Sequence, residues 1–445
     1  RMPDDGFVQF NKHIIEYMRG VYVLLLISLL GYAGRVGGQE SVTITQCYEW
    51  ARANYPQIHQ MGLIDQTERY SLSNVGKAWL PQLSVSGKAS YQSDVTKLPL
   101  DGDKISSLLP GFEIPSLSKD QYQVVAQVDQ TIWDGGSTHS ARALTRAEAI
   151  ANREQLESEL YALNDRVNQI YFGCLLQDEL IRQNALLQKE LQVNIERIKA
   201  MIDNGVANQS DLESMEVELL NTRQNEIELR ASRTAYRQML ATFINKPLTD
   251  QVVLKTPESP ERSLSTQINR PELRALDAKS EWIETQNKQV TAGLMPRIGA
   301  FVQGGYGRPG LNMLEDSFEP YYVAGVRLSW NLGKLYTLKN DRRKIEVSRR
   351  QIDVQRETFL FNTRLQLLQQ NTEIKKMTDL MRADDDIIRL RTSIKQAAEV
   401  KLENGVISVT DLIREINAED MARQTAAAHR VQRLMTIYNY MYTTN

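Results

Sequence analysis

The sequence has few of the residues that build catalytic or metal sites, with four histidines and two cysteines among 445 residues. The histidines are scattered, and none has the spacing of zinc ligands or lies beside a nucleophile motif. They are His13, His59, His139 and His429. The sequence therefore argues against an enzyme, and we expect no catalytic, cofactor-binding or metal-binding residue.

The scarcity of cysteine leaves room for one disulfide at most, between Cys47 and Cys174. An exported protein could form such a bond. Cys174, however, continues an apolar pattern with helical 3-4 spacing, which is typical of a buried helix face. The earlier members of this pattern are Leu156, Leu160, Leu163, Val167 and Ile170. We therefore predict that Cys174 is a buried core thiol.

Long apolar runs and excess charge are also missing. The net charge of −2 gives no reason to expect a nucleic-acid partner. The apolar run Val21–Leu30 follows Met18-Arg19-Gly20, the pattern of a secretory signal, and it falls short of the ~20 residues that span a bilayer. We expect residues 1–38 to be upstream sequence and a signal peptide, with cleavage after Gly38.

What the chain does contain is one unit written twice. Asp203-Asn204-Gly205-Val206 recurs as Glu403-Asn404-Gly405-Val406, and each turn is followed at the same spacing by Asp-Leu, at Asp211 and Asp411. Such internal repetition indicates a duplicated architecture rather than unlike domains. We predict a first repeat over 39–245, a linker over 246–265 that contains three prolines, and a second repeat over 266–445.

Each repeated turn interrupts a very long helical stretch. Asn-Gly supplies the left-handed conformation that ends a helix, and Ser210 or Thr410 with its following aspartate can cap the next one. We predict an unbroken helix from Ser137 to Asp203 that returns over 207–245. In the second repeat a helix runs to Glu403 and returns from Ile407 to about Tyr442.

Four segments alternate apolar and polar residues, as strands with one apolar and one wet face do. Their length suits a tilted crossing of a bilayer, but four strands cannot close a membrane barrel, which takes about eight. Several chains would have to pool them, and a trimer would give twelve. A small sheet packed on soluble helices is the alternative, which the polar face fits poorly. The strands are expected at about 80–91, 121–133, 296–306 and 321–330.

Taken together, these residues closely resemble the TolC family of outer membrane efflux proteins. The resemblance covers the chain from about Ser41. It rests on Leu80-Pro81-Gln82-Leu83 and Met295-Pro296-Arg297-Ile298, on Gln130 to Gly136, on the repeated Asn-Gly-Val turns, and on the whole pattern occurring twice. It implies a homotrimer in the outer membrane of a Gram-negative bacterium, with a 12-stranded β-barrel continued by a periplasmic α-helical tunnel.

The resemblance also implies partners and site residues. The hairpin tips would dock onto a periplasmic adaptor joined to an inner-membrane pump. The tip contacts would be Asn204, Gly205, Val206, Asn404, Gly405 and Val406, and the periplasmic entrance would be lined by Ile202, Asp211, Leu402 and Asp411. The sequence departs from the family here, because an aromatic residue usually stands at 202 and 402. A second acidic residue is replaced by Ser214 and Arg414.

We therefore expect a passive channel-tunnel of a tripartite efflux or type I secretion system. Energy would come from the partner pump, and opening would untwist the tip hairpins. The alternative is a soluble periplasmic coiled-coil adaptor or scaffold. Such a protein would carry a single hairpin flanked by compact β domains, whereas this chain has two hairpins with amphipathic strands between its helices.

Overall fold

The computed structural model describes residues 41–96, 116–259 and 266–445. The expected signal segment and most of the loop between the first two strands lie outside these residues. The fold is mainly α-helical with four long strands, as the sequence predicts. No helix in the described ranges has a stretch that is both long and apolar enough to cross a membrane.

The described chain divides into two compact units that take segments from both repeats. One unit contains residues up to Tyr55, Leu163–Leu264 and Gln369–Tyr442. The other contains Pro56–Ala162, Ser265–Leu368 and Thr443–Asn445. We call them the hairpin unit and the sheet unit. The repeat boundaries predicted from the sequence stay a prediction, since the units cut across them.

The sheet unit contains a four-stranded antiparallel sheet in the order β2-β3-β5-β6. Its strands are β2 (Gln82–Tyr91), β3 (Asp120–Trp133), β5 (Arg297–Arg308) and β6 (Glu319–Ser329). The two strands of the first repeat thus pair with the two of the second through β3 and β5, with Val128 opposite Val302. The strands lie where the alternating pattern predicts them.

The two faces of this sheet differ in character. Residues directly opposite in an antiparallel pair share a face, so the register assigns one apolar face and one polar face. On the apolar face, Leu83 is 71% exposed and Tyr322 is 80% exposed, and no helix in the described part of the sheet unit covers them. The opposite face carries Ser84, Ser86, Lys88, Gln123, Gln127 and Asp129.

Long helices make up the rest of the sheet unit. They are α3 (Gln60–Gly76), α5 (Ser137–Tyr161), α8 (Pro271–Ala292) and the first half of α9 (Lys334–Glu403). Ile283 of α8 packs with Ile345 and Ile352 of α9 in a small buried cluster. Ion pairs tie the same elements at the surface, including Arg349 to Glu284 at 2.7 Å.

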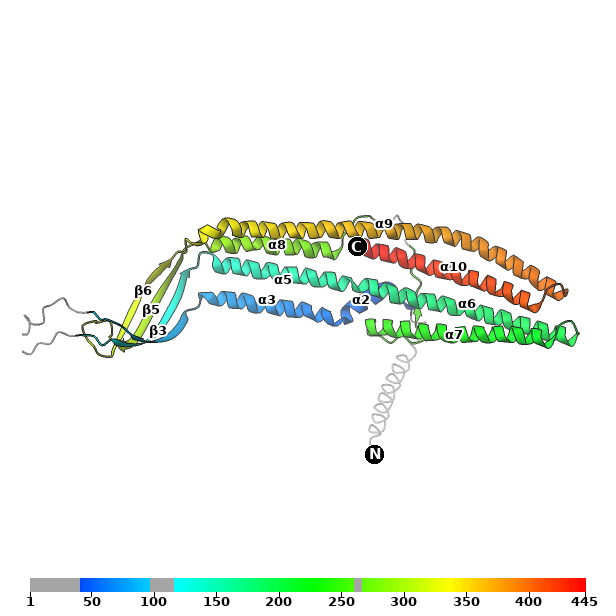
Figure 1. Cartoon of the computed structure of the whole chain (residues 1–445), viewed down its shortest axis with the longest axis horizontal. Helices are drawn as coiled ribbons and strands as arrows, with labels where there is room; N and C mark the ends of the chain where they lie inside the picture. The colour runs from blue at the N-terminus through cyan, green and yellow to red at the C-terminus, as the bar shows by residue number, and fades with distance from the viewer. Residues whose placement is uncertain (1–40, 97–115, 260–265) are drawn as a thin grey trace, which may run out of the picture. The chain divides into compact units, whose positions relative to one another are not determined.

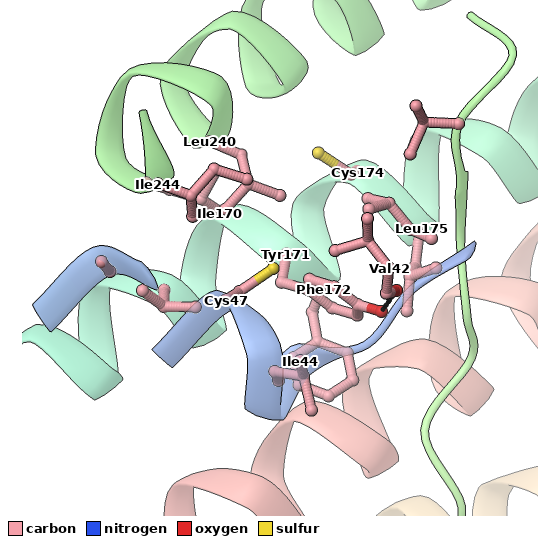
Figure 2. Packing of buried hydrophobic residues seen from close by; sticks show 14 residues of the cluster. Val42, Ile44, Cys47, Ile170, Tyr171, Phe172, Cys174, Leu175, Leu240 and Ile244 are labelled. Atoms are coloured by element: carbon pink, nitrogen blue, oxygen red, sulfur yellow. Dashed lines mark hydrogen bonds between the residues drawn. The ribbon is translucent and has the colours of Figure 1, made fainter. Parts of the chain in front are cut away.

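The hairpin unit is organised around α6 (Leu163–Asp203), which pairs with α7 (Gln209–Ile244), and it includes the second half of α9 with α10 (Val409–Thr444). Its larger core joins α6 and α7 to the short helix α2 (Ile44–Asn54), as Figure 2 shows. Cys47 and Cys174 are both buried in this core as free thiols. The prediction of a buried thiol at Cys174 is therefore confirmed.

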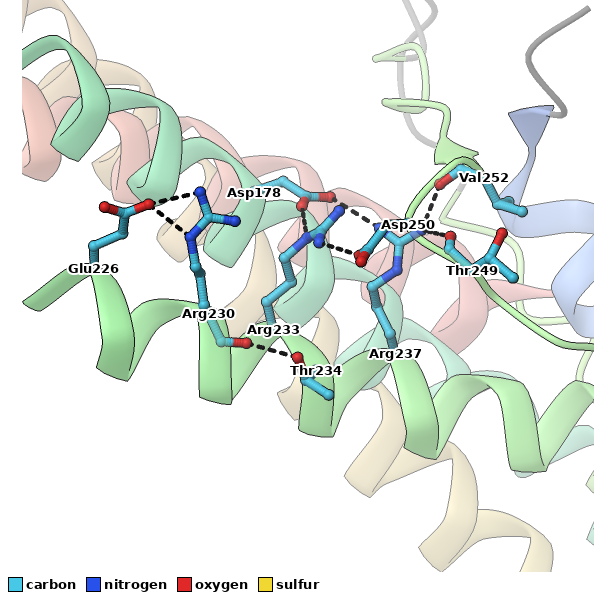
Figure 3. Close-up of polar contacts among 9 residues, drawn as sticks. All are labelled: Asp178, Glu226, Arg230, Arg233, Thr234, Arg237, Thr249, Asp250 and Val252. Carbon is cyan, nitrogen blue, oxygen red and sulfur yellow. Dashed lines mark hydrogen bonds and ion pairs between the residues drawn. The ribbon is translucent and has the colours of Figure 1, made fainter.

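The segment after α7, which was predicted as a linker, is held to the rest of the hairpin unit by strand pairing and hydrogen bonds. Val253–Leu254 (β4) pairs in parallel with Ser41–Val42 (β1), and the Tyr171 hydroxyl lies 2.9 Å from the Val42 carbonyl oxygen and 2.7 Å from that of Lys255. The guanidinium of Arg237, only 4% exposed, donates to the carbonyl oxygens of Thr249 and Val252 (Figure 3).

One helix prediction is wrong. The helix expected to run unbroken from Ser137 to Asp203 is interrupted at Ala162, although the Ala162 N–H still lies 3.3 Å from the Ser158 carbonyl oxygen. Pro56 begins a short 3₁₀ helix, Pro56–His59. Thr43 and Gln46 form a capping box at the start of α2, with hydrogen bonds in both directions.

The buried contacts of Arg237 predict a specific loss of stability. Arg237→Met removes a buried charged donor from both carbonyl oxygens, although that of Thr249 still accepts from the N–H of Val252 at 3.0 Å. We expect this loss to cost about 2–3 kcal/mol. The matched control is Arg230→Gln on the same helix, which breaks only the exposed pair with Glu226 at 2.6 Å and costs under about 0.5 kcal/mol. Chemical unfolding in detergent, followed by circular dichroism, measures both, and equal small losses would contradict the role of Arg237.

Candidate functional site

The two hairpin tips have the same backbone construction. The N–H of Val206 donates to Met201 O at 2.8 Å and that of Gly205 to Ile202 O at 2.9 Å; Val406 and Gly405 repeat both bonds at the same distances. This is the Schellman arrangement, which needs a left-handed residue after the helix. Gly205 has φ of 74° and Gly405 of 70°, so glycine meets that need in both tips.

The helices after the turns begin at Gln209 and Val409, and the N-cap of each lies two residues before the predicted one. The N-cap side chains are Asn208 and Ser408, which accept from the N–H of Asp211 at 3.1 Å and of Asp411 at 3.2 Å. Each aspartate in turn accepts from the N–H of its N-cap residue at 3.2 Å. The expectation that Ser210 or Thr410 caps these helices is therefore wrong. The side-chain oxygen that reaches the third N–H lies three residues before the aspartate.

Asp211 and Asp411, which were predicted at the entrance, thus each form part of a helix cap within the chain. Asp411 also pairs with Arg414 at 3.2 Å. Hydrogen bonds from Ser408, with a smaller contribution from the Arg414 charge, hold the pKa of the Asp411 carboxyl below its usual value. A fixed negative charge therefore stands at the second tip at neutral pH.

The tips present bare backbone and one apolar side chain each. Val206 is 57% exposed and Val406 is 68% exposed. A Cβ placed on Gly205 or Gly405 would meet no atom within 4 Å. Each tip therefore presents an exposed valine side chain beside a glycine with free space around it. Another helical element can approach such a surface closely.

Behind the tips, the two hairpins are joined by an apolar cluster. Leu402, predicted at the entrance, is only 4% exposed within this cluster, and Ile202 is half-buried against it. In this chain both side chains therefore pack between the hairpins rather than projecting freely. The tip cluster comprises Leu187, Leu191, Ile195, Ile198, Leu212, Met215, Leu219, Ala398, Leu402, Val409, Leu412 and Ile416.

A buried ionic cluster lies further along the same helices. The Lys395 ammonium of α9 pairs with Glu190 of α6 and, at 2.7 Å, with Glu419 of α10. The Glu419 carboxylate is 3% exposed and also accepts from Thr392 at 2.6 Å and from Arg423 at 3.0 Å. Three helices from both hairpins thus share one charge network.

The environments of the neighbouring carboxyls Glu419 and Asp420 shift their pKa values in opposite directions. Burial alone would raise the pKa of Glu419, but hydrogen bonds from Lys395, Thr392 and Arg423 outweigh it and lower the pKa to about 2. For the neighbouring Asp420, burial raises the pKa to about 6. A hydrogen bond from the Gln424 amide at 2.5 Å and the charge of Arg423 oppose this rise but do not cancel it. Glu419 is therefore the anion that Lys395 neutralises.

Sequence reasoning found the tips but missed this cluster. Glu190 and Lys395 are 205 positions apart, and each stands in an ordinary run of helical charges. One weak signal for this cluster was present in the sequence, which is that Glu190 and Lys395 stand near the apolar stripe of their helices.

Comparison with known proteins identifies a family. Residues 47–246 match the family described as outer membrane efflux protein. No match was found among curated protein sequences.

Solved structures show the same fold over nearly the whole chain. The outer-membrane channel OprN has a TM-score of 0.64 at 14% identity, covering 90% of this chain and 89% of its own. CusC has a TM-score of 0.63 at 14% identity, with coverage of 90% and 92%. The outer membrane protein VceC from Vibrio cholerae has a TM-score of 0.60 at 12% identity, with coverage of 89% and 95%.

Breaking the ionic cluster from one side should loosen the pairing of the hairpins. Lys395→Met leaves the buried Glu419 charge undercompensated and costs about 3 kcal/mol, whereas the double variant Lys395→Met/Glu419→Gln costs less than the sum of its parts. Lys199→Met, which breaks a surface pair with Glu196 at 3.0 Å, is the control. Thermal unfolding in detergent measures Lys395→Met, Glu419→Gln, the double variant and the control, and additive losses would contradict a coupled cluster.

Proposed function

Because residues 47–246 place this chain in the outer membrane efflux protein family, we propose that it is the exit channel of a tripartite efflux or type I secretion system. Membership of the family gives it a location in the outer membrane of a Gram-negative bacterium, an extension into the periplasm and a role in transport. Proteins of this family are channels rather than enzymes. The channel conducts passively, and a partner pump supplies the energy.

The observation that carries this proposal is the uncovered apolar face of the sheet. Val85 and Val326 are each 70% exposed on it. Lipid is the solvent in which such a face is stable, while the polar face suits water. Within the described residues the sheet ends in the unpaired edges of β2 and β6. A lipid-embedded edge must find a partner. A homotrimer pairs these edges between copies and closes a twelve-stranded barrel.

The alternative of a soluble adaptor or scaffold has less support. A single hairpin suffices for such a protein, whereas the hairpin unit contains two, joined by the tip cluster and the ionic cluster. An exposed apolar sheet of this size in water would also be a site of aggregation.

The hairpin tips are the proposed docking surface for the periplasmic adaptor. Asn204, Gly205 and Val206, with their counterparts Asn404, Gly405 and Val406, form two rigid turns in one unit. Exposed valine beside open glycine allows close approach of another helical hairpin, with little side-chain ordering on binding. Through the adaptor the channel would receive substrate from an inner-membrane pump.

The entrance is proposed to lie just inside these tips, at Asp211 and Asp411, with Ile202 and Leu402 behind them. The aspartates hold the helix starts in shape within each chain, and contacts between chains around them would keep the closed state. Outward movement of the tip hairpins would then open the path.

A crosslinking experiment tests the docking surface. A photocrosslinker attached through Val206→Cys should capture a periplasmic adaptor, identified by mass spectrometry as a protein with a helical hairpin and an inner-membrane attachment. The native thiols do not compete, because burial raises the pKa of both Cys47 and Cys174 to about 12. Arg223→Cys, on α7 away from the tip, is the matched control. Equal capture from both positions would refute tip docking.

Single-channel recording tests the entrance. Asp211→Ala/Asp411→Ala should raise conductance in planar bilayers, because it removes negative groups that hold the closed state. Asn208→Ala/Ser408→Ala breaks the same capping boxes, at about 1 kcal/mol each, and keeps the carboxylates. If both double variants open the channel equally, loss of capping rather than loss of charge is responsible, and no change in either removes the aspartates from the gate.

A further inference from the structure

The polar face of the sheet carries an uneven set of charges near its junction with α5. Arg297, Arg327 and Asp129 lie on this face, as the pairing of Gly299 with Arg327 and of Gln82 with Asp129 requires. They line a recess of about 290 Å³ together with the first residues of α5. All of them belong to the sheet unit.

Arg327 is held in place by an aromatic ring. Its guanidinium lies 4.7 Å from the centre of the Phe301 ring, and one nitrogen lies 3.6 Å from Asp129 Oδ1. Phe301 itself lies against Gly325, where a Cβ would come within 3.1 Å of the ring. Stacking fixes the plane of the guanidinium, and the Arg327 side chain is 57% exposed, so solvent reaches its further N–H groups.

Arg297 has no carboxylate partner among the residues that the structure describes. Its one polar contact in the described ranges is with Ser137 Oγ at 3.4 Å, and it forms no ion pair there. The nearby Asp134 is occupied otherwise, since its carboxylate accepts from the N–H of Gly136 at 2.9 Å and of Thr138 at 2.6 Å. The Asp134 carboxylate therefore interacts with the positive end of the α5 helix dipole rather than with Arg297.

The recess holds two arginines and two aspartates, but its unused polar groups are guanidinium N–H donors. Asp129 contacts Arg327 through one nitrogen, the Asp134 carboxylate accepts from the first N–H groups of α5, and Arg297 forms no ion pair in the described ranges. Two guanidinium groups beside one small recess form a site suited to carboxylate or phosphate oxygens, which accept paired N–H donors.

We propose that this recess is an anion-binding subsite on the inner wall of the pore, which gives the channel a preference for anions and holds anionic groups of passing substrates. It rests on the proposed function, because the polar face lines a water-filled path only if the strands close a barrel. Three copies would then form a ring of six arginines. Each copy also contributes Asp129 and Asp134, so the preference depends on the positive charge of Arg297, which no described carboxylate pairs and which raises the local anion concentration.

Reversal potentials in planar bilayers under a potassium chloride gradient test the subsite. Arg297→Gln/Arg327→Gln should lower the chloride-to-potassium permeability ratio by at least about twofold, the effect of one unit charge roughly 10 Å from an ion in water. Asp129→Asn frees Arg327 and should raise the ratio. Arg297→Lys/Arg327→Lys keeps the charge and should leave the ratio near that of the wild type.

The outcomes separate the subsite from the pore. Channels that conduct but show the same permeability ratio in wild type, the glutamine variant and Asp129→Asn would overturn the subsite and leave the channel proposal intact. Absence of any conductance from the wild-type protein would overturn both. If the glutamine variant fails to insert, Asp129→Asn still decides, because it must raise the ratio. The entrance residues are the same in every variant, so their charge cancels in the comparison.

Discussion

The constraint on which the rest of the structure depends is the apolar face of the four-stranded sheet. A soluble protein buries such a face against helices or a second sheet, but no helix of the sheet unit covers it. The strands instead expose valine, leucine and tyrosine on one side and serine, glutamine and charge on the other. A bilayer satisfies the first side and a watery lumen the second. In the proposed barrel both edges pair with neighbouring copies, so the proposed membrane environment and the proposed oligomer rest on one feature.

The hairpin unit meets a different requirement, which is to hold two tips firmly while leaving their ends free. Each turn satisfies its backbone within itself, through a Schellman motif on one side and a capping box on the other. The tip cluster and the pairing of Lys395 with Glu190 and Glu419 then join the hairpins. A buried ion pair adds little net stability but penalises wrong pairings strongly. It therefore suits an interface between helices that must keep one register.

Sequence reasoning succeeded where a local rule decides the outcome. The left-handed backbone after a helix explains Gly205 and Gly405, and the period of two predicts the strands. The place of Cys174 in an apolar stripe predicts its burial. It failed where the cause is long-range or subtle. No helix-breaking residue predicts the interruption at Ala162. The hydrogen bonds from Arg237 to Thr249 and Val252 depend on how the chain returns along α7. The caps were misassigned because Asn208 and Ser210 both suit an N-cap.

The candidate site divides in the same way. The turns and the aspartates could be read from the duplicated sequence, since both copies share them. The burial of Leu402 between the hairpins could not, because an apolar residue near a helix end gives no sign of which surface it faces. The charges of the polar sheet face were visible in the sequence, but only the register shows that Arg297, Arg327 and Asp129 share a recess.

The most direct test of a lipid-facing sheet is spin-label accessibility at two adjacent residues of β2 in the reconstituted protein. A label at Val85→Cys should collide with oxygen dissolved in the bilayer, and a label at Ser84→Cys should collide with a water-soluble nickel complex. Equal access of the nickel complex to both positions would contradict a membrane-spanning sheet.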